Sequence, residues 1–144
     1  MLIDSIKNGV KSGLKTFWFL IKIIIPVYLF ITILKHTPAM DWLVSVFAPF
    51  MGVFNLPGEA ALPIITGMIL DEFGIISAIK AVNLTGFTVT AVSAMALTAH
   101  SLLVEGAIVK KMGLSVVLFT AYRIIGAVIV GFILRFLGVV FNLW

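Results

Sequence analysis

The sequence predicts an all-α integral membrane protein, and three observations lead to this prediction. Of the 144 residues, 62% are hydrophobic and only 11% are charged, whereas a soluble domain is about half apolar and about a quarter charged. Apolar stretches recur at or near the length of a membrane-spanning helix, which is about 20 residues. Polar residues gather in short segments between those stretches. We therefore expect an amphipathic N-terminal helix, about three full transmembrane helices and one re-entrant helical hairpin.

Residues 1–15 are predicted to form an interfacial amphipathic helix, and residues 16–144 to form the transmembrane domain. The N-terminal segment carries apolar side chains at helical spacing on one face. A second face carries lysines that step by four residues: Lys7, Lys11 and Lys15. Such a helix lies on a membrane surface with its lysines towards anionic head groups. The first full span is expected over 16–34, with a kink at Pro26.

A re-entrant hairpin is predicted at about residues 40–72. Two apolar arms, 40–54 and 60–70, are each too short to span a bilayer. They are joined by Asn55-Leu56-Pro57-Gly58-Glu59, a break that also places a carboxylate in an apolar region. Broken backbone at bilayer depth must be buried in protein or line a wet cavity. The alternative is one full span interrupted by an ordinary surface loop.

The rest of the chain predicts a short interfacial helix over 74–82 and two long helices, from about Asn83 to Lys111 and from Leu114 to about Phe141. Basic residues then fall on one side of the membrane: Lys7, Lys11, Lys15, Lys110 and Lys111. The acidic residues fall on the other side, and these are Asp41, Asp71 and Glu72. Lys35 and Lys80 fall on that side too. Because the basic side is normally cytoplasmic, we expect a multi-pass protein of the cell membrane with its N-terminus inside and its C-terminus outside.

Ionisable side chains inside apolar segments are the main candidates for function, since a charge at the helix centre costs about 2.5–3.5 kcal/mol on insertion scales. On a wheel of about 100° per residue, polar side chains of the 83–111 helix share an arc of roughly 160°. These are Thr90, Ser93, Thr98, His100, Ser101 and Glu105. The stripe either binds neighbouring helices or lines a site for a polar solute. Counting from the turn at Lys111 to Gly113 places Arg123 opposite, where it would pair with Glu105 as a structural ion pair or a ligand contact.

The predicted substrate-binding residues are Asn55, Gly58, Glu59, Thr98, His100, Ser101, Glu105 and Arg123. Glu59 is the leading candidate, although a carboxylate in the first turn after a break also caps a helix dipole. The sequence predicts no enzyme, because it shows no nucleophile–base motif, no paired-histidine metal spacing and no phosphate-binding glycine loop. No metal, cofactor or nucleic-acid partner is expected, and with no cysteine there is no thiolate ligand.

Three segments resemble the nucleoside recognition, or Gate, family. They are Leu56-Pro57-Gly58-Glu59-Ala60-Ala61-Leu62-Pro63, Thr98-Ala99-His100-Ser101-Leu102-Leu103-Val104-Glu105 and Lys111-Met112-Gly113. The family includes part of the ferrous-iron transport protein B membrane region, the spore maturation proteins A and B, and parts of concentrative nucleoside transporters. The resemblance implies re-entrant helices, solute movement and a need for a second copy, such as a homodimer, or a homologous membrane partner.

Two functions follow as expectations. The first is a transport-type module in the lipid bilayer that binds or moves a small polar solute, such as a nucleoside or a cation. The second is a non-transporting assembly or regulatory protein of the spore-maturation type, in which the polar stripe is a helix–helix interface. The chain lacks the GTPase domain of the iron transporter, so nucleotide hydrolysis is not expected to drive it.

Overall fold

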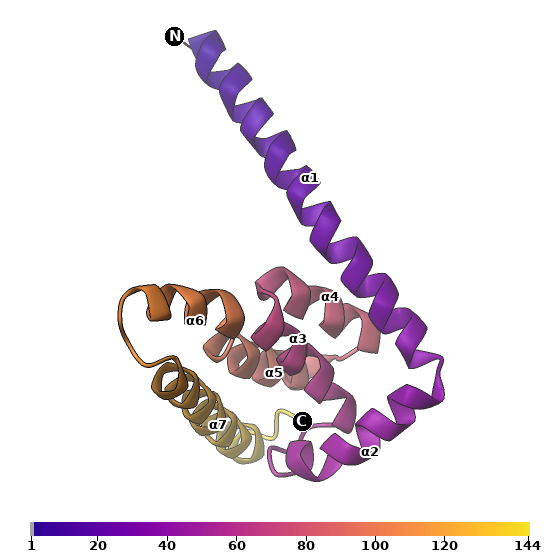
Figure 1. Ribbon diagram of the computed structural model, residues 1–144. Coiled ribbons are helices and arrows are strands. Elements are labelled where there is room, and N and C mark those ends of the chain that lie inside the picture. Colours follow the sequence, from indigo (N-terminus) through magenta and orange to yellow (C-terminus); the bar gives the residue numbers. More distant parts are fainter. Residues whose placement is uncertain (1) are drawn as a thin grey trace.

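The computed structural model describes residues 2–144, and all of their side chains except those at 2–4, 20, 23, 27, 34 and 35. Over this part of the chain the regular elements are all helices (Figure 1). In chain order they are α1 (Leu2–Lys35), α2 (Pro38–Gly52), the 3-10 turn η1 (Gly58–Ala60), α3 (Ala61–Ile69), α4 (Glu72–Val82), α5 (Gly86–Thr98), α6 (Leu102–Lys111) and α7 (Val116–Val140). The all-α prediction is confirmed.

Helix α1 is one continuous helix that leaves the bundle as a long arm (Figure 1). It continues as α-helix through Pro26, where a kink was expected. Only its C-terminal part packs on the bundle, where Ile31 joins Met40, Ala78 and Val82 in a buried cluster. Residues 5–19 are exposed. Met1 lies outside the described residues, and the interfacial placement of residues 1–15 stays a prediction.

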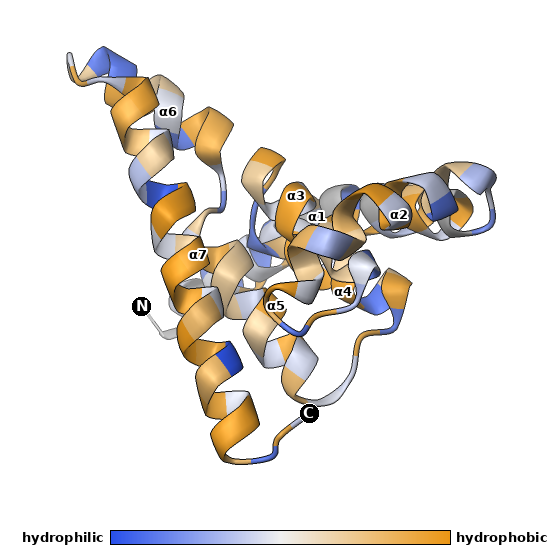
Figure 2. Ribbon diagram, turned by 90° about the horizontal axis from the view of Figure 1, so that it is seen from below, coloured by the Kyte–Doolittle hydropathy of each residue, from blue (hydrophilic) through white to orange (hydrophobic). Residues whose placement is uncertain are grey.

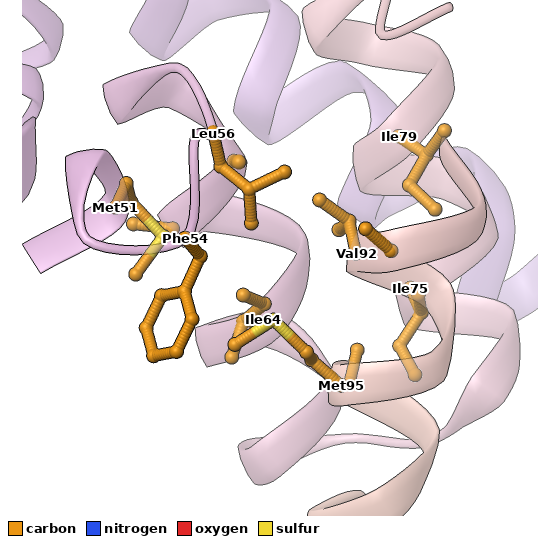
Figure 3. Close-up of a cluster of buried hydrophobic side chains, with 12 residues drawn as sticks. Met51, Phe54, Leu56, Ile64, Ile75, Ile79, Val92 and Met95 are labelled. Carbon is orange, nitrogen blue, oxygen red and sulfur yellow. The ribbon is translucent and has the colours of Figure 1, made fainter. Parts of the chain in front are cut away.

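The centre of the bundle is formed by α3, α4 and α5 (Figure 1). Gly67 of α3 lies against Ile75 of α4, so closely that a Cβ at Gly67 would lie 2.5 Å from Ile75 Cγ1. Val92 and Met95 of α5 pack against the same layer (Figure 3). Because Gly67 has no side chain and Met95 is flexible, three short helices can approach closely enough to form an apolar core.

Three helical segments are long and apolar enough to cross a membrane: Ser5–Ile33, Gly86–Lys111 and Val116–Val140. Their apolar side chains point outward as well as inward, and Figure 2 shows hydrophobic residues along most of α7. Outward-facing apolar side chains over the length of a span are typical of contact with lipid rather than water. The chain is therefore built as a multi-pass membrane protein.

Two expectations about element boundaries need correction. The long helix predicted from Asn83 to Lys111 is interrupted, because α5 ends at Thr98 and α6 begins at Leu102. The short helix predicted at 74–82 begins earlier, at Glu72, and packs on α1, α3 and α5, while its interfacial placement stays a prediction. The Asp71 carboxylate caps it by accepting a hydrogen bond from Gly74 N–H at 3.0 Å.

The two arms predicted for the hairpin are short helices, as expected, with η1 between them. Helix α3 nevertheless packs mainly on α4 and α5, while α2 contacts the η1 turn. The break before η1 contains Asn55 in the left-handed region at φ 60°. Whether the pair is re-entrant in the bilayer stays a prediction, since the packing fixes only how α2, η1 and α3 meet each other.

Candidate functional site

The break between α5 and α6 is stabilised by hydrogen bonds to α3. Ser101 adopts the left-handed conformation at φ 52°, which a side chain other than glycine rarely takes. Its N–H donates to Gly67 O at 2.8 Å, and its hydroxyl donates to Leu70 O at 2.8 Å. Those carbonyls lie at the C-terminal end of α3, where helix carbonyls lack partners within their own helix. The break therefore supplies hydrogen-bond donors to the carbonyls of α3. As a result, α5 and α6 do not form one continuous helix.

A cluster of three ionisable side chains, His100, Glu105 and Arg123, lies at this break. Arg123 Nη2 of α7 lies 3.2 Å from Glu105 Oε2 and donates to His100 O at 3.0 Å. The side chains of Arg123, Glu105 and His100 are 24%, 29% and 27% exposed. Pairing removes two isolated charges from an apolar region, where each alone is costly. The predicted Arg123–Glu105 pair is present in the structure.

The orientation of the His100 ring follows from its neighbours. Nδ1 lies 2.5 Å from Leu97 O and 3.2 Å from Arg123 Nη2. A carbonyl oxygen can only accept, so the short contact assigns the Nδ1 hydrogen to Leu97 O. Arg123 then directs its hydrogens to the His100 carbonyl and the Glu105 carboxylate. Nε2 lies 3.7 Å from Glu105 Oε1, beyond hydrogen-bonding distance, so this edge of the ring is the one available to a ligand.

Thr98 does not join this cluster through its hydroxyl group. Its Oγ1 donates to Ala94 O at 2.7 Å, within its own helix. Such back-bonding is the structural role that serine and threonine commonly take in apolar helices. The arc of polar side chains was predicted for one continuous helix. It does not hold beyond Thr98, because α6 begins in a new direction after the break. One continuous helix would place Leu103 on the same face as Val92, but Leu103 is exposed whereas Val92 is buried.

The three remaining predicted residues, Asn55, Gly58 and Glu59, lie at the other end of α3. Glu59 precedes this helix, whereas Ser101 contacts Gly67 and Leu70 at its C-terminal end. At 1.5 Å per residue, the two ends are about 12 Å apart along the axis. Glu59 is partly buried, and among the described residues it has neither a hydrogen-bond nor an ion-pair partner. The predicted site residues thus fall into two groups, one at each break.

Gly58 is explained by a close approach of η1 to α2. A Cβ at Gly58 would lie 2.9 Å from Val44 O and 2.9 Å from Val44 Cγ1. Since one of these is a backbone atom, Gly58→Ala should force the two elements apart and destabilise the protein by about 1–3 kcal/mol. Thermal unfolding in detergent micelles measures this. Gly52→Ala, at a position where a Cβ meets nothing within 4 Å, is the matched control and should unfold at nearly the original temperature.

Arg135 is a residue at this end of α3 that the sequence-based site did not include. Its Nη1 donates to Val53 O at 2.6 Å, at the C-terminal cap of α2. Helix carbonyls at this position lack partners within the helix, and a guanidinium is a suitable donor. The signal that could have identified it is a second arginine within the apolar α7 segment.

Cavities in the structure are mainly apolar. One cavity, of about 860 Å³, lies between the end of α3, α6 and α7, and Lys110 and Thr120 are the polar residues of its lining. Its walls suit apolar groups better than a polar solute, so we place the polar site at the breaks themselves. Among the described residues, no three His, Asp or Glu side chains are grouped so that they could hold a metal ion.

The fold and its polar breaks define a class: a helical multi-pass membrane protein that keeps compensated charges at an interrupted span. The chain belongs to the Gate family, described as nucleoside recognition, whose family model matches residues 17–140. The expected family membership is therefore confirmed.

One similar protein is the uncharacterized membrane protein YvoD of Bacillus subtilis (strain 168), with 39% identity over 116 residues. The match covers 81% of this chain and 37% of YvoD, so the chain spans little more than a third of that relative's length. A comparison with solved structures found no significant match.

Proposed function

We propose that the chain is a transport-type membrane module that binds a small polar solute at its helix breaks. The observation that carries this proposal is the interruption of the Gly86–Lys111 span at residues 99–101, beside the Arg123–Glu105 pair. The interruption leaves 13 residues before it in α5 and 10 after it in α6, so it lies near the middle of the span. Interrupted helices near the midplane are how many secondary transporters bind solutes.

The site offers both donors and acceptors. The Arg123 guanidinium and the Nε2 edge of the His100 ring lie at one break. The Glu59 carboxylate, which has no partner among the described residues, lies with Asn55 at the other. Such a mixture suits an uncharged or zwitterionic solute with several hydrogen-bonding groups, such as a nucleoside, better than a bare anion. Nothing in this arrangement activates a nucleophile, so the proposed role is binding or movement without chemical conversion.

A second unit is part of the proposal, because the two breaks of one chain lie at opposite ends of α3. Each break forms within one chain, but a second copy or a homologous chain would let Glu59 of one unit and the cluster of the other face a shared solute. The greater length of YvoD, in which the matched region is 37% of the chain, supports a larger assembly of this kind. The lysine distribution favours one orientation, with the N-terminus in the cytoplasm.

Thermal stabilisation of the purified protein tests this function. The panel comprises nucleosides, nucleobases, divalent cations and small polar metabolites. A solute at about 100 times its Kd should add about 2.7 kcal/mol to the unfolding free energy. Because Glu59 has no partner among the residues that the structure describes, Glu59→Ala should abolish this gain while leaving the unliganded protein as stable as before. Glu72→Ala, which removes an exposed carboxylate, is the control. A solute bound equally well by Glu59→Ala and His100→Ala would contradict the site.

The alternative function is that of an assembly or regulatory membrane protein. It is favoured by one observation: the charges at the α5–α6 break compensate each other without a ligand. In that case Glu105→Gln should change the oligomeric state on a sizing column before any other property. If the variant keeps its oligomeric state and loses solute binding, the transport-type function is supported instead.

A further inference from the structure

The two breaks of this chain are built alike. Each contains a non-glycine residue in the left-handed conformation, Asn55 at φ 60° and Ser101 at φ 52°. Each is followed by a leucine at the next position, a glutamate four positions on and an alanine six positions on. These pairs are Leu56 and Leu102, Glu59 and Glu105, and Ala61 and Ala107. The two breaks therefore share this pattern of residues, although Ser101 directly precedes α6 whereas Asn55 lies three residues before the η1 turn.

At each break, an arginine of α7 also donates a hydrogen bond to a backbone carbonyl. Arg123 Nη2 donates to His100 O at 3.0 Å, and Arg135 Nη1 donates to Val53 O at 2.6 Å. Both acceptors lie just beyond the end of a helix, α5 or α2, where carbonyls have no partner in the helix ladder. The two arginines are 12 residues apart, or about 18 Å along one helix.

The two arginines differ in their second partner. Arg123 also pairs with Glu105, so its position is explained by charge compensation alone. Arg135 has no ion pair among the described residues, and the Val53 carbonyl is its hydrogen-bond acceptor there. Arg135 lies five residues before the end of α7, so its guanidinium could instead have extended to the interface. Its direction towards Val53 O links α7 to the first break.

We propose that Arg135 is a positioning residue that fixes the first break, in the way that Arg123 fixes the second. Through these two arginines, α7 sets the distance between the two breaks. Arg135 acts on the segment that carries Asn55 and Glu59, so its effect on a solute rests on the function proposed above. The effect of Arg135 on the backbone of the first break does not rest on that function. It can be measured without a solute.

Cysteine labelling tests this proposal, because the chain contains no cysteine of its own. Ala60→Cys reports on the first break and Ala99→Cys on the second, and both alanines are 0% exposed. In Arg135→Gln, maleimide should label Ala60→Cys about tenfold faster, because a hydrogen bond from a charged donor has been lost and the break opens more often. Labelling of Ala99→Cys should stay at its original rate. Arg135→Lys, which keeps a charged donor, should restore much of the protection.

An unchanged rate at Ala60→Cys in Arg135→Gln would overturn the proposal. An equal increase at both reporters would also overturn it, since that would mean general destabilisation instead of local positioning. If the labelling result holds and no solute stabilises the protein, the positioning role stands and the proposed function fails. If a solute is found, Arg135→Gln should weaken its binding and Arg135→Lys should retain it.

Discussion

Replacing Arg123 with leucine is expected to destabilise the protein by about 3 kcal/mol, because it leaves Glu105 without its counter-ion in an apolar region. The guanidinium lies 3.2 Å from Glu105 Oε2 and also satisfies His100 O. Removing one member of a partly buried pair costs more than the pair itself contributes, since the other charge stays partly desolvated. Chemical unfolding of the purified variant in detergent micelles measures the loss.

The double variant Arg123→Leu with Glu105→Leu is the matched control. With both charges gone, no carboxylate is left unpaired, so most of the lost stability should return. A single variant as stable as the unaltered protein would mean that lipid head groups or water compensate Glu105. A double variant no more stable than the single one would mean that the pair acts through packing and not through charge.

Ser101→Val should be the second damaging substitution, at about 2–4 kcal/mol. A β-branched residue is strained at φ 52°, which costs about 1–3 kcal/mol. The change also removes the hydroxyl that donates to Leu70 O, worth about 1 kcal/mol. We expect a lower melting temperature and faster proteolysis at the α5–α6 break.

Ser101→Gly separates these two causes. Glycine adopts φ 52° freely and keeps the N–H that donates to Gly67 O. It loses the hydroxyl bond alone, so its stability should remain within about 1 kcal/mol of the original. If valine and glycine were equally harmful, the left-handed conformation would not be what the site requires.

The fold class could be predicted because composition and span length are global properties, and the interruption near Asn55 to Glu59 carries proline and glycine. The second break could not, because Thr98 to Ser101 contains neither residue. It exists because Gly67 O and Leu70 O, which lie more than 30 residues earlier in the chain, accept hydrogen bonds from Ser101. Local propensity was overridden by these distant acceptors.

The charged residues of the candidate site could be predicted from the sequence, but their arrangement in space could not. Counting residues from the turn at Gly113 was enough to pair Arg123 with Glu105, since antiparallel neighbours keep their register. The position of Glu59 relative to that pair depends on how α3 packs between the breaks, which no local pattern encodes. The same holds for Arg135, whose acceptor Val53 lies 82 residues earlier.

The Arg123–Glu105 pair also bears on how the chain is made. Glu105 leaves the ribosome 18 residues before Arg123, a delay of about 1–4 s at ordinary elongation rates. During that interval α6 carries a carboxylate whose counter-ion has not yet been synthesised. We expect α6 to enter the bilayer poorly on its own and to insert together with α7, as one unit. A version of the chain that ends before α7 should leave α6 outside the bilayer and accessible to water-soluble reagents.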